Sequence, residues 1–288
     1  MRKIIILIRN LLDFILPETQ MGDKIYSYIN FIFNHKGRFP KNQVLFNDYM
    51  FNLKTSSEII NPLRVFITDK EFGKFYIKSV VGDEYNVPTY KVLNSQDEVD
   101  NYTFPSECVI KPTHMSGKVI LKKKNDTVDT KRVKKWFTKN FYNRSRERNY
   151  KDLIPKVIVE EMVFGDSNLS DLKFFCFKGE AKLIQIDHDR YINHTLSLYD
   201  INWKRQNYSI TFEQYKQNIE KPENLENIIK VVNKLAASLR LEFIRIDTYA
   251  NNEKFYIGEL TNLHGNAAEI FYPQTGEHEA SKIIFNPH

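Results

Sequence analysis

The alternation of apolar and polar residues is most regular between Leu241 and Asn266. Apolar side chains recur from Phe243 to Ile246 and again from Phe255 to Ile257, and the polar pair Asn251-Asn252 separates the two runs. Short alternating runs joined by an Asn-rich turn are typical of a β-hairpin. We therefore predict two antiparallel strands here, in which residues far apart in sequence become neighbours across the pair.

Each predicted strand of this hairpin carries one acid, Asp247 on the first and Glu259 on the second. Carboxylates, with a hydroxyl or amide such as that of Thr261 or Asn262, are hard oxygen ligands that suit Mg²⁺. Arg245 lies two residues before Asp247, so its side chain should share that face and offer a positive charge to phosphates. The alternative is an ordinary solvated face that happens to carry two acids.

Helical spacing of apolar residues is found from residue 21 to residue 68, where no candidate chemistry is visible. Asp69 then has the character of a helix N-cap. The apolar positions after it predict a helix from Lys70 to Val80, ended by Gly82. An extended segment begins at Val87-Pro88. Taken alone, a lysine in such a helix would be read as a solubilising surface charge.

A strand–loop–strand pattern follows, with strands predicted at Cys108–Lys111 and Lys118–Leu121 and a loop at Pro112–Gly117. The loop contains the small residues Thr113, Ser116 and Gly117. Such a loop lets backbone N–H groups approach phosphate, and Lys111 at its edge would add a point charge. It lacks the P-loop pattern, and an ordinary surface turn is the competing interpretation. His114 would either touch phosphate or substrate, or be exposed and idle.

Residues 129 to 143 show helical spacing, with basic residues around an apolar side. The apolar positions are Val133, Trp136, Phe137 and Phe141. A basic stretch from Arg144 to Arg148 comes next. A solvated basic face is the default interpretation, and a site for a polyanionic substrate is the sharper alternative.

The run Val157–Val159 predicts a buried strand that ends at Glu160-Glu161. Two acids at this place commonly mean that the strand has reached solvent. They also suit a nucleoside site, in which the backbone after the strand pairs with an adenine edge and a carboxylate binds ribose hydroxyls.

Residues 171 to 190 predict two further antiparallel strands that turn at Lys178-Gly179. Lys173 alternates with Phe174, so its side chain should point away from the core and into a cleft. Asp187, Asp189 and Arg190 finish the second strand.

Composition places the chain among ordinary globular proteins, with 288 residues of which 42% are hydrophobic and 27% charged. The net charge of +6 suits phosphorylated or polyanionic ligands, but no nucleic-acid recognition motif accompanies it, and we predict no nucleic-acid partner. The cysteines, Cys108 and Cys176, lie in apolar strand-like runs. Buried free thiols at these places would fit a reducing cytoplasm.

The first sixteen residues combine basic and apolar side chains, but Arg9, Asn10 and Asp13 interrupt the apolar run. The run is therefore shorter than the roughly 18 residues expected of a membrane-spanning helix. No small-residue cleavage site follows, so a signal peptide is not indicated. An amphipathic helix remains, either packed on the protein or lying on a membrane surface, and we favour packing.

Six segments in this order resemble the ATP-grasp ligases, and among them the TupA-like branch named for teichuronopeptide biosynthesis. They are Asp69-Lys70 opening a helix, VIKP with its small-residue loop, IVEE, DLKFF, RID and GELTN. The resemblance spans about residues 20 to 275. It implies an α+β fold in which two α+β lobes with antiparallel sheets hold ATP between them. The implied domains are a helical N-terminal segment (1–68), a lid lobe (69–158) and a C-terminal lobe with the metal site (159–288).

The resemblance also implies roles for individual residues on the nucleotide. Lys70, Lys111 and Lys173 resemble the lysines that grip the ATP phosphates, under a loop that includes His114, Ser116 and Gly117. The segment Glu160, Glu161, Met162 and Val163 resembles the adenine-binding hinge, with Glu160 or Glu161 on the ribose.

Metal and substrate roles follow from the same resemblance. Asp247 and Glu259 resemble the acidic ligands of two Mg²⁺ ions, and Arg245, with Lys173, resembles the cations that steady the transferred phosphate. Many ATP-grasp enzymes have Asn at the place of Thr261, so the third metal ligand is open; we assign Thr261 to the metal and Asn262 to the substrate. The expected acceptor contacts are Asp189, Arg190 and His194.

The implied activity is that of an ATP- and Mg²⁺-dependent carboxylate–amine ligase that forms an amide through an acyl-phosphate. The implied substrates are an amino acid and a sugar acid of a cell-surface polysaccharide. The alternatives are a kinase of a polysaccharide precursor on the same fold, a non-catalytic nucleotide- or glycan-binding protein, and a glycosyltransferase. We expect a cytoplasmic protein, with the N-terminal helix as the only candidate for contact with the inner face of the membrane.

Overall fold

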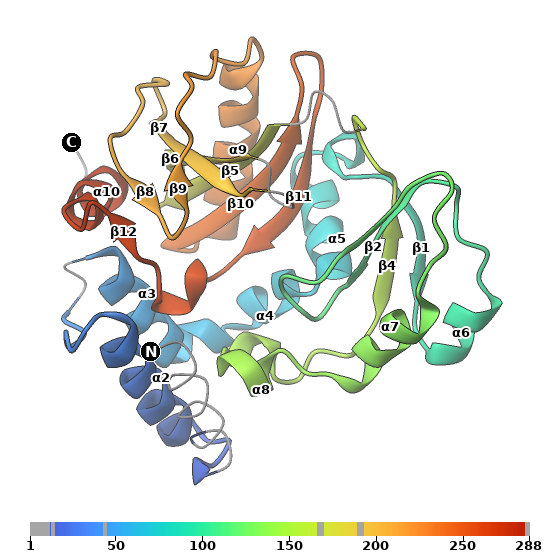
Figure 1. The fold of residues 1–288 in the computed structure, drawn as a ribbon, viewed down its shortest axis with the longest axis horizontal. Coiled ribbons are helices and arrows are strands. Elements are labelled where there is room, and N and C mark those ends of the chain that lie inside the picture. Colours follow the sequence, from blue (N-terminus) through green and yellow to red (C-terminus); the bar gives the residue numbers. More distant parts are fainter. Residues whose placement is uncertain (1–11, 13–14, 43–44, 166–169, 189–192, 286–288) are drawn as a thin grey trace.

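The computed structural model describes residues 12, 15–42, 45–165, 170–188 and 193–285. These residues form two lobes, each built on its own sheet (Figure 1). The predicted N-terminal amphipathic helix lies almost entirely outside the described residues. Within the described residues, no helix combines the length and the apolar character needed to cross a bilayer.

The lid lobe contains, within the described residues, a four-stranded antiparallel sheet in the order β1-β4-β2-β3. Its strands are β1 (Thr89–Leu93), β2 (Cys108–Pro112), β3 (Ile120–Lys122) and β4 (Val157–Glu160). One face packs on α6 (Gln96–Asn101) and α7 (Thr130–Lys134) around Leu93, Ile110 and Trp136. The strand–loop–strand prediction is confirmed, with the second strand starting two residues later than expected.

The second lobe holds a larger sheet, six-stranded in the described part of the chain, in the order β11-β10-β5-β6-β7-β9. The strands are β5 (Ser170–Phe177), β6 (Glu180–His188), β7 (Thr195–Asp200), β9 (Glu213–Gln214), β10 (Phe243–Ala250) and β11 (Phe255–Thr261). All neighbours are antiparallel except β7 and β9, which are parallel. Both predicted hairpins, with turns after Phe177 and after Ala250, are confirmed.

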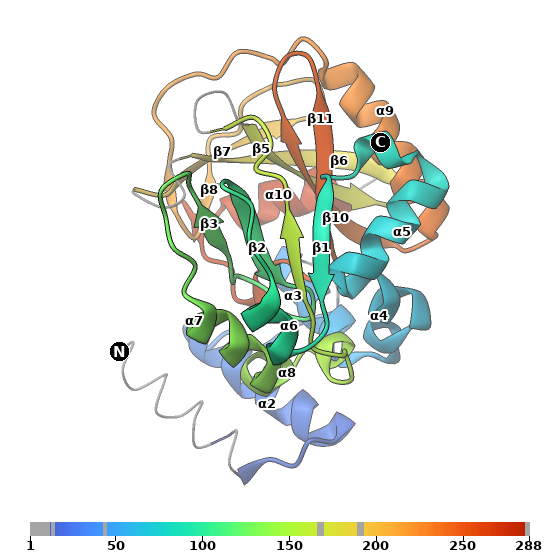
Figure 2. The ribbon, with the colours of Figure 1, turned by 90° about the vertical axis from the view of Figure 1, so that its right-hand side faces the viewer.

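Helices cover both faces of this sheet (Figures 1 and 2). On one face, α9 (Leu225–Leu239) and α5 (Lys70–Val80) pack against Leu172, Phe174 and Ile246. On the other, α3 (Phe46–Thr55) and α10 (Gly276–Phe285) pack against apolar residues that include Phe175 and Phe243. The rest of that second face is polar, and this polar area carries the candidate site.

The remaining elements connect these layers. They are α2 (Gln20–Asn34), η1 (Ser57–Ile60), α4 (Pro62–Thr68), η2 (Asp83–Tyr85), η3 (Lys135–Thr138), α8 (Tyr142–Ser145), η4 (Arg148–Tyr150), β8 (Ser209–Ile210), η5 (Gly265–Ala267) and β12 (Phe271–Tyr272). Asp69 caps α5, and its carboxylate accepts from the N–H groups of Glu71 and Phe72 at 2.9 and 3.4 Å. The predicted N-cap is therefore confirmed.

The single helix predicted over residues 129 to 143 is wrong. The segment is divided into α7, η3 and α8, and Lys139 between them is extended. The carbonyls of Trp136 and Lys139 accept from Nε2 of His114, at 3.1 and 3.2 Å. A continuous helix would use those carbonyls internally, so this side-chain contact competes with it.

The proposed domain limits differ from the observed packing in three places. Ile77 of α5 lies in the core of the second lobe, although the limit at residue 69 would assign α5 to the lid. The limit at residue 158 falls inside β4, which continues to Glu160 in the lid sheet. The N-terminal helices likewise belong to the second lobe, because Phe46 and Met50 pack on its sheet.

Candidate active site

The hairpin β10–β11 brings the two predicted metal ligands together. Asp247 and Glu259 are directly opposite each other in the strand register. The register shifts immediately afterwards, between Asp247 and Thr248, which leaves Gly258 as an extra residue. A Cβ on Gly258 would lie 2.6 Å from Cε2 of Tyr249, so the ring occupies space that only glycine leaves free.

Arg245 lies on the same face as these acids, as its spacing predicted. Its guanidinium binds both oxygens of Asp247, at 2.6 and 2.7 Å, and donates to Oγ1 of Thr261 at 3.2 Å. It also donates to Nδ1 of His264 at 2.5 Å. Burial disfavours the charge, but Asp247 outweighs it and holds the pKa of Arg245 above its usual value. The guanidinium is thus a fixed positive charge.

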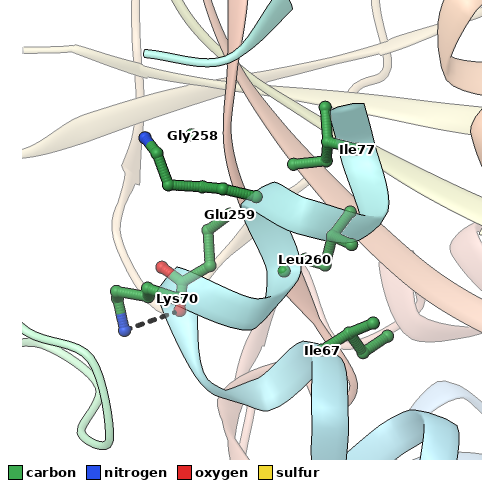
Figure 3. A pocket seen from close by; sticks show the side chains of 8 residues that line it. Ile67, Lys70, Ile77, Gly258, Glu259 and Leu260 are labelled. Carbon is green, nitrogen blue, oxygen red and sulfur yellow. Dashed lines mark ion pairs between the residues drawn. The ribbon is translucent and has the colours of Figure 1, made fainter. Parts of the chain in front are cut away.

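Lys70, the first residue of α5, forms an ion pair with Glu259 (Figure 3). Its Nζ lies 3.2 Å from Oε1 of Glu259 and donates to the carbonyl of Met115 at 2.7 Å. Burial raises the pKa of Glu259, but the ammonium groups of Lys70 and Lys111 outweigh this and lower it overall. Lys70 therefore connects the small-residue loop of the lid with the acids of the second lobe.

Lys111 on β2 and Glu160 on β4 form a buried ion pair within the lid lobe. Glu160 lies 2.6 Å from Lys111 and 2.5 Å from Lys74, and its side chain is 2% exposed. Burial opposes ionisation of both groups, yet their mutual attraction raises the pKa of Lys111 and lowers that of Glu160. Both oxygens of Glu160 thus accept from lysines, which favours Glu161 among the two acids predicted for the ribose.

In the segment 161–163 after β4, the predicted adenine hinge, Glu161 is the acid that faces solvent. Glu161 is exposed, and its N–H donates to the carbonyl of Pro88 at 2.9 Å. Val163 is buried, and Met162 between them is half-buried. The neighbouring Phe164 packs its ring 5.4 Å from that of Tyr256 on β11. The predicted adenine hinge thus passes directly along the edge strand of the second lobe.

Lys173 points to the polar face, as predicted, opposite Asp247 in the register of β5 and β10. Its Nζ forms ion pairs with Asp187 and, at 3.0 Å, with Asp171. His194 lies 3.5 Å from Asp187, which places this predicted acceptor contact at the same end of the sheet. Asp189 and Arg190 lie outside the described residues.

His114 corrects another prediction, because it is neither exposed nor directed at a phosphate. It is 2% exposed, its Nδ1 accepts from the N–H of Lys156 at 3.4 Å, and its Nε2 donates to two carbonyls. Burial lowers its pKa. His114 therefore fixes the base of the loop through its hydrogen bonds. Ser116 and Gly117, at the tip of the loop, are more exposed to solvent.

We expect the stability conferred by neutral His114 to fall in acid. Its folded pKa is depressed, so only the unfolded chain binds the proton as the pH falls through about 6.5. Wild type should lose up to about 1.4 kcal/mol more unfolding free energy than His114→Asn between pH 7.5 and 5.5. Urea unfolding at both pH values measures this. Equal losses in the two proteins would show that His114 is not held neutral.

Asn262 is a further correction, since it does not face the cleft as a substrate contact would. It is 3% exposed; its Oδ1 accepts from Arg64 at 3.0 Å, and its Nδ2 donates to the Arg64 carbonyl and to Oγ1 of Thr68. Its amide is fully used within the protein. Asn262 thus fixes the end of β11 against α4, which positions Glu259 and Thr261.

The sequence analysis gave no role in the site to three charged residues, Lys74, Lys156 and Asp187. Lys74 forms an ion pair with Glu160, and Asp187 forms one with Lys173. Lys156 forms ion pairs with Asp69, at 3.3 Å, and with Glu71. Asp187 could have been found from its strand, because it is opposite Asp171 and thus near Lys173. Lys74 and Lys156 gave no such signal, since their partners lie 86 and 85 residues away.

The donor set fits a divalent cation and a polyphosphate. Asp247 and Glu259 offer carboxylate oxygens from adjacent strands, and each oxygen has a second lone pair beyond the one used by a cation. Lys70, Lys111 and Arg245 surround these acids with positive charge. Within the described residues, no group of three or more His, Cys, Asp or Glu side chains is arranged to hold a metal ion, and Thr261 stays a prediction as the third ligand.

The family model described as TupA-like ATPgrasp matches residues 49–282. The chain belongs to this family. The resemblance recognised in the six sequence segments is thereby confirmed, and so is the α+β ATP-grasp fold with helices at its N-terminal side. No curated protein matches the chain.

The chain is similar to solved structures of ligases at low sequence identity. The D-alanine–D-alanine ligase from Bacillus anthracis is 18% identical over 77% of this chain and 65% of its own, with a TM-score of 0.46. An L-amino acid ligase from Bacillus licheniformis is 13% identical over 93% of this chain and 58% of its own, with a TM-score of 0.47. The TupA-like chain thus spans less than two thirds of the length of either ligase.

Proposed function

We propose that this TupA-like protein is an ATP- and Mg²⁺-dependent carboxylate–amine ligase that forms an amide through an acyl-phosphate. One observation supports this proposal above all. Asp247 and Glu259 are opposite each other on one polar face, where Arg245 binds Asp247 and Lys70 binds Glu259. A polyphosphate that carries a metal ion requires both kinds of group, carboxylates to bind the metal and cations to bind the phosphates.

In this proposal, ATP lies between the lobes with its adenine along the hinge Glu161–Val163. Glu161 binds the ribose, since Glu160 is held by lysines. Lys70 and Lys111 bind phosphate oxygens as point charges. The backbone at Ser116 and Gly117 covers the phosphates, and the positive φ of Gly117 (69°) allows the loop to turn tightly there.

Asp247 and Glu259 hold Mg²⁺, with Thr261 as the third protein ligand. The metal ions, when bound, neutralise charge on the phosphates during transfer. Arg245 is kept in place by Asp247 and His264, so it meets the growing negative charge without reorganising. Lys173, fixed by Asp171 and Asp187, adds a second positive charge to the same face.

The lid would exclude water, because an acyl-phosphate that meets water is hydrolysed and the ATP is wasted. We propose an amino acid and a sugar acid of a cell-surface polysaccharide as substrates, with His194 near the acceptor. A cytoplasmic location belongs to the same proposal, and both cysteines are buried free thiols, as predicted.

Hydroxylamine trapping tests the reaction type. Purified protein with ATP, Mg²⁺ and a panel of sugar acids and amino acids should release ADP and form a hydroxamate, because hydroxylamine attacks an acyl-phosphate. ADP release with a phosphate ester and no hydroxamate would instead show a kinase. Absence of ADP release across the panel would favour a non-catalytic binding protein.

A further inference from the structure

The segment Glu147–Tyr150 carries polar side chains that the chain itself leaves unused. Glu147 is 6% and Tyr150 is 7% exposed, and among the described residues neither the carboxylate nor the hydroxyl has a hydrogen-bond or ion-pair partner. Oδ1 of Asn149 and Nη1 of Arg148 are also buried without a hydrogen-bond partner. Buried polar groups are nearly always satisfied, so the two unpartnered atoms of Arg148 and Asn149, beside the nearly buried Glu147 and Tyr150, point to a ligand.

The backbone around these groups is firmly held. Ser145 accepts at its carbonyl from Lys54 at 2.8 Å and from Asn266 at 3.3 Å. Nδ2 of Asn149 donates to Oγ1 of Thr68 at 3.0 Å, and Thr68 accepts in turn from Asn262. The unused side chains therefore do not result from a loose loop. They are presented by a segment that is fixed on both sides.

This segment adjoins the candidate active site. Asn149 is connected through Thr68 to Asn262, the residue that follows Thr261. On its other side, Asn266 belongs to η5, directly after His264, which binds Arg245. Burial raises the pKa of Tyr150, and the carboxylates of Glu147, Glu259 and Asp247 act on it in the same direction. Tyr150 is thus within electrostatic range of both Glu147 and the metal-binding acids.

We propose that Glu147 and Tyr150 bind the ammonium group of the amine substrate, and that Arg148 binds the carboxylate of the same amino acid. This assignment rests on the proposed ligase function and names the acceptor class of that site. An ammonium group has only donors, so it matches the acceptors Glu147, Tyr150 and Oδ1 of Asn149. Phosphates and the carboxylate to be activated are anions, which Glu147 would repel.

The nearby charges agree with this choice. Arg146 is committed to Asp23 at 3.1 Å, and Lys54 donates to the Ser145 carbonyl, so neither neutralises Glu147 through an ion pair. Burial raises the pKa of the Glu147 carboxyl to about 7, and Lys54 offsets this only in part. A bound ammonium group would supply the positive charge that stabilises a buried carboxylate and that Glu147 lacks.

Partition of the acyl-phosphate between two nucleophiles tests the site. Hydroxylamine is small and neutral, so it does not need an ammonium-binding group, whereas an amino acid does. The ratio of amide to hydroxamate should fall about 10- to 100-fold in Glu147→Gln, the loss expected for one charged hydrogen bond. Glu107→Gln, which removes an exposed acid from the lid lobe, is the matched control.

A binding measurement keeps this test independent of turnover. With Mg²⁺ and a non-hydrolysable ATP analogue, free amino acids should raise the Tm of wild type and N-acetyl amino acids should not. Glu147→Gln should fold normally, because it removes an unpaired buried acid, but its Tm should not respond to amino acids. An equal Tm response of the two proteins, including no response in either, would overturn the amine site.

The two proposals fail in different ways. A wild-type protein that forms neither hydroxamate nor ADP refutes the ligase function. A wild-type protein that forms both hydroxamate and amide, with the same product ratio in Glu147→Gln, refutes only the role of Glu147.

Discussion

Glu259→Gln is expected to lower the rate of ADP formation at least about 10²- to 10³-fold, the range for losing one preorganised charged group at a reacting centre. Glu259 is opposite Asp247 and is paired with Lys70, so the change removes a metal ligand and frees a lysine at once. Steady-state ADP release with saturating ATP and Mg²⁺, measured with the substrate found by hydroxylamine trapping, checks the result.

Glu253→Gln is the control for this variant. Glu253 is exposed in the turn of the same hairpin, so its loss changes the net charge equally without touching the site. Circular dichroism and the Tm should show that both variants fold. A Glu259→Gln protein that turns over like Glu253→Gln would contradict the metal assignment.

Lys111→Gln is expected to raise the KM for ATP about 10- to 100-fold, as expected when a charged hydrogen bond to a phosphate is lost. It should also lower the free energy of unfolding by about 1–3 kcal/mol, the cost of removing one partner of a buried charged group. The loss of unfolding free energy is limited because Lys74 still forms an ion pair with Glu160 at 2.5 Å. ATP kinetics and urea unfolding separate the two effects.

A triple variant distinguishes binding from stability. Lys111→Gln with Lys74→Gln and Glu160→Gln leaves no unpaired charge in this buried cluster, so it should regain stability while ATP binding stays weak. Lys124→Gln, an exposed lysine of the same lobe, should behave like wild type in both assays. Recovery of the KM together with stability would mean that Lys111 acts on the fold alone.

The parts of the site that the sequence predicted depend on local pattern. Strict alternation around Arg245 and Asp247 placed both side chains on one face, and the Asn-rich turn placed Glu259 opposite them. The same rule directed Lys173 to the polar face. Such inferences succeed because strand periodicity is a geometric property of the backbone.

The parts that failed depend on contacts between distant segments. No local signal shows that His114 binds the carbonyls of Trp136 and Lys139 and so interrupts a helix. Nor does it show that Lys74 binds Glu160 across 86 residues, or that Asn262 is enclosed by Arg64. Burial decides whether a polar residue is free for a ligand, and burial is set by the complete fold.

The packing of the N-terminal helices has a consequence for how the protein is assembled. The core that contains Phe46 and Met50 also contains Phe175, Phe243 and Ile284, so the second lobe is discontinuous along the chain. A fragment starting at residue 159 would expose that apolar surface and should aggregate. Synthesis must therefore reach the last helix before this lobe can close, and closing so long a loop slows folding.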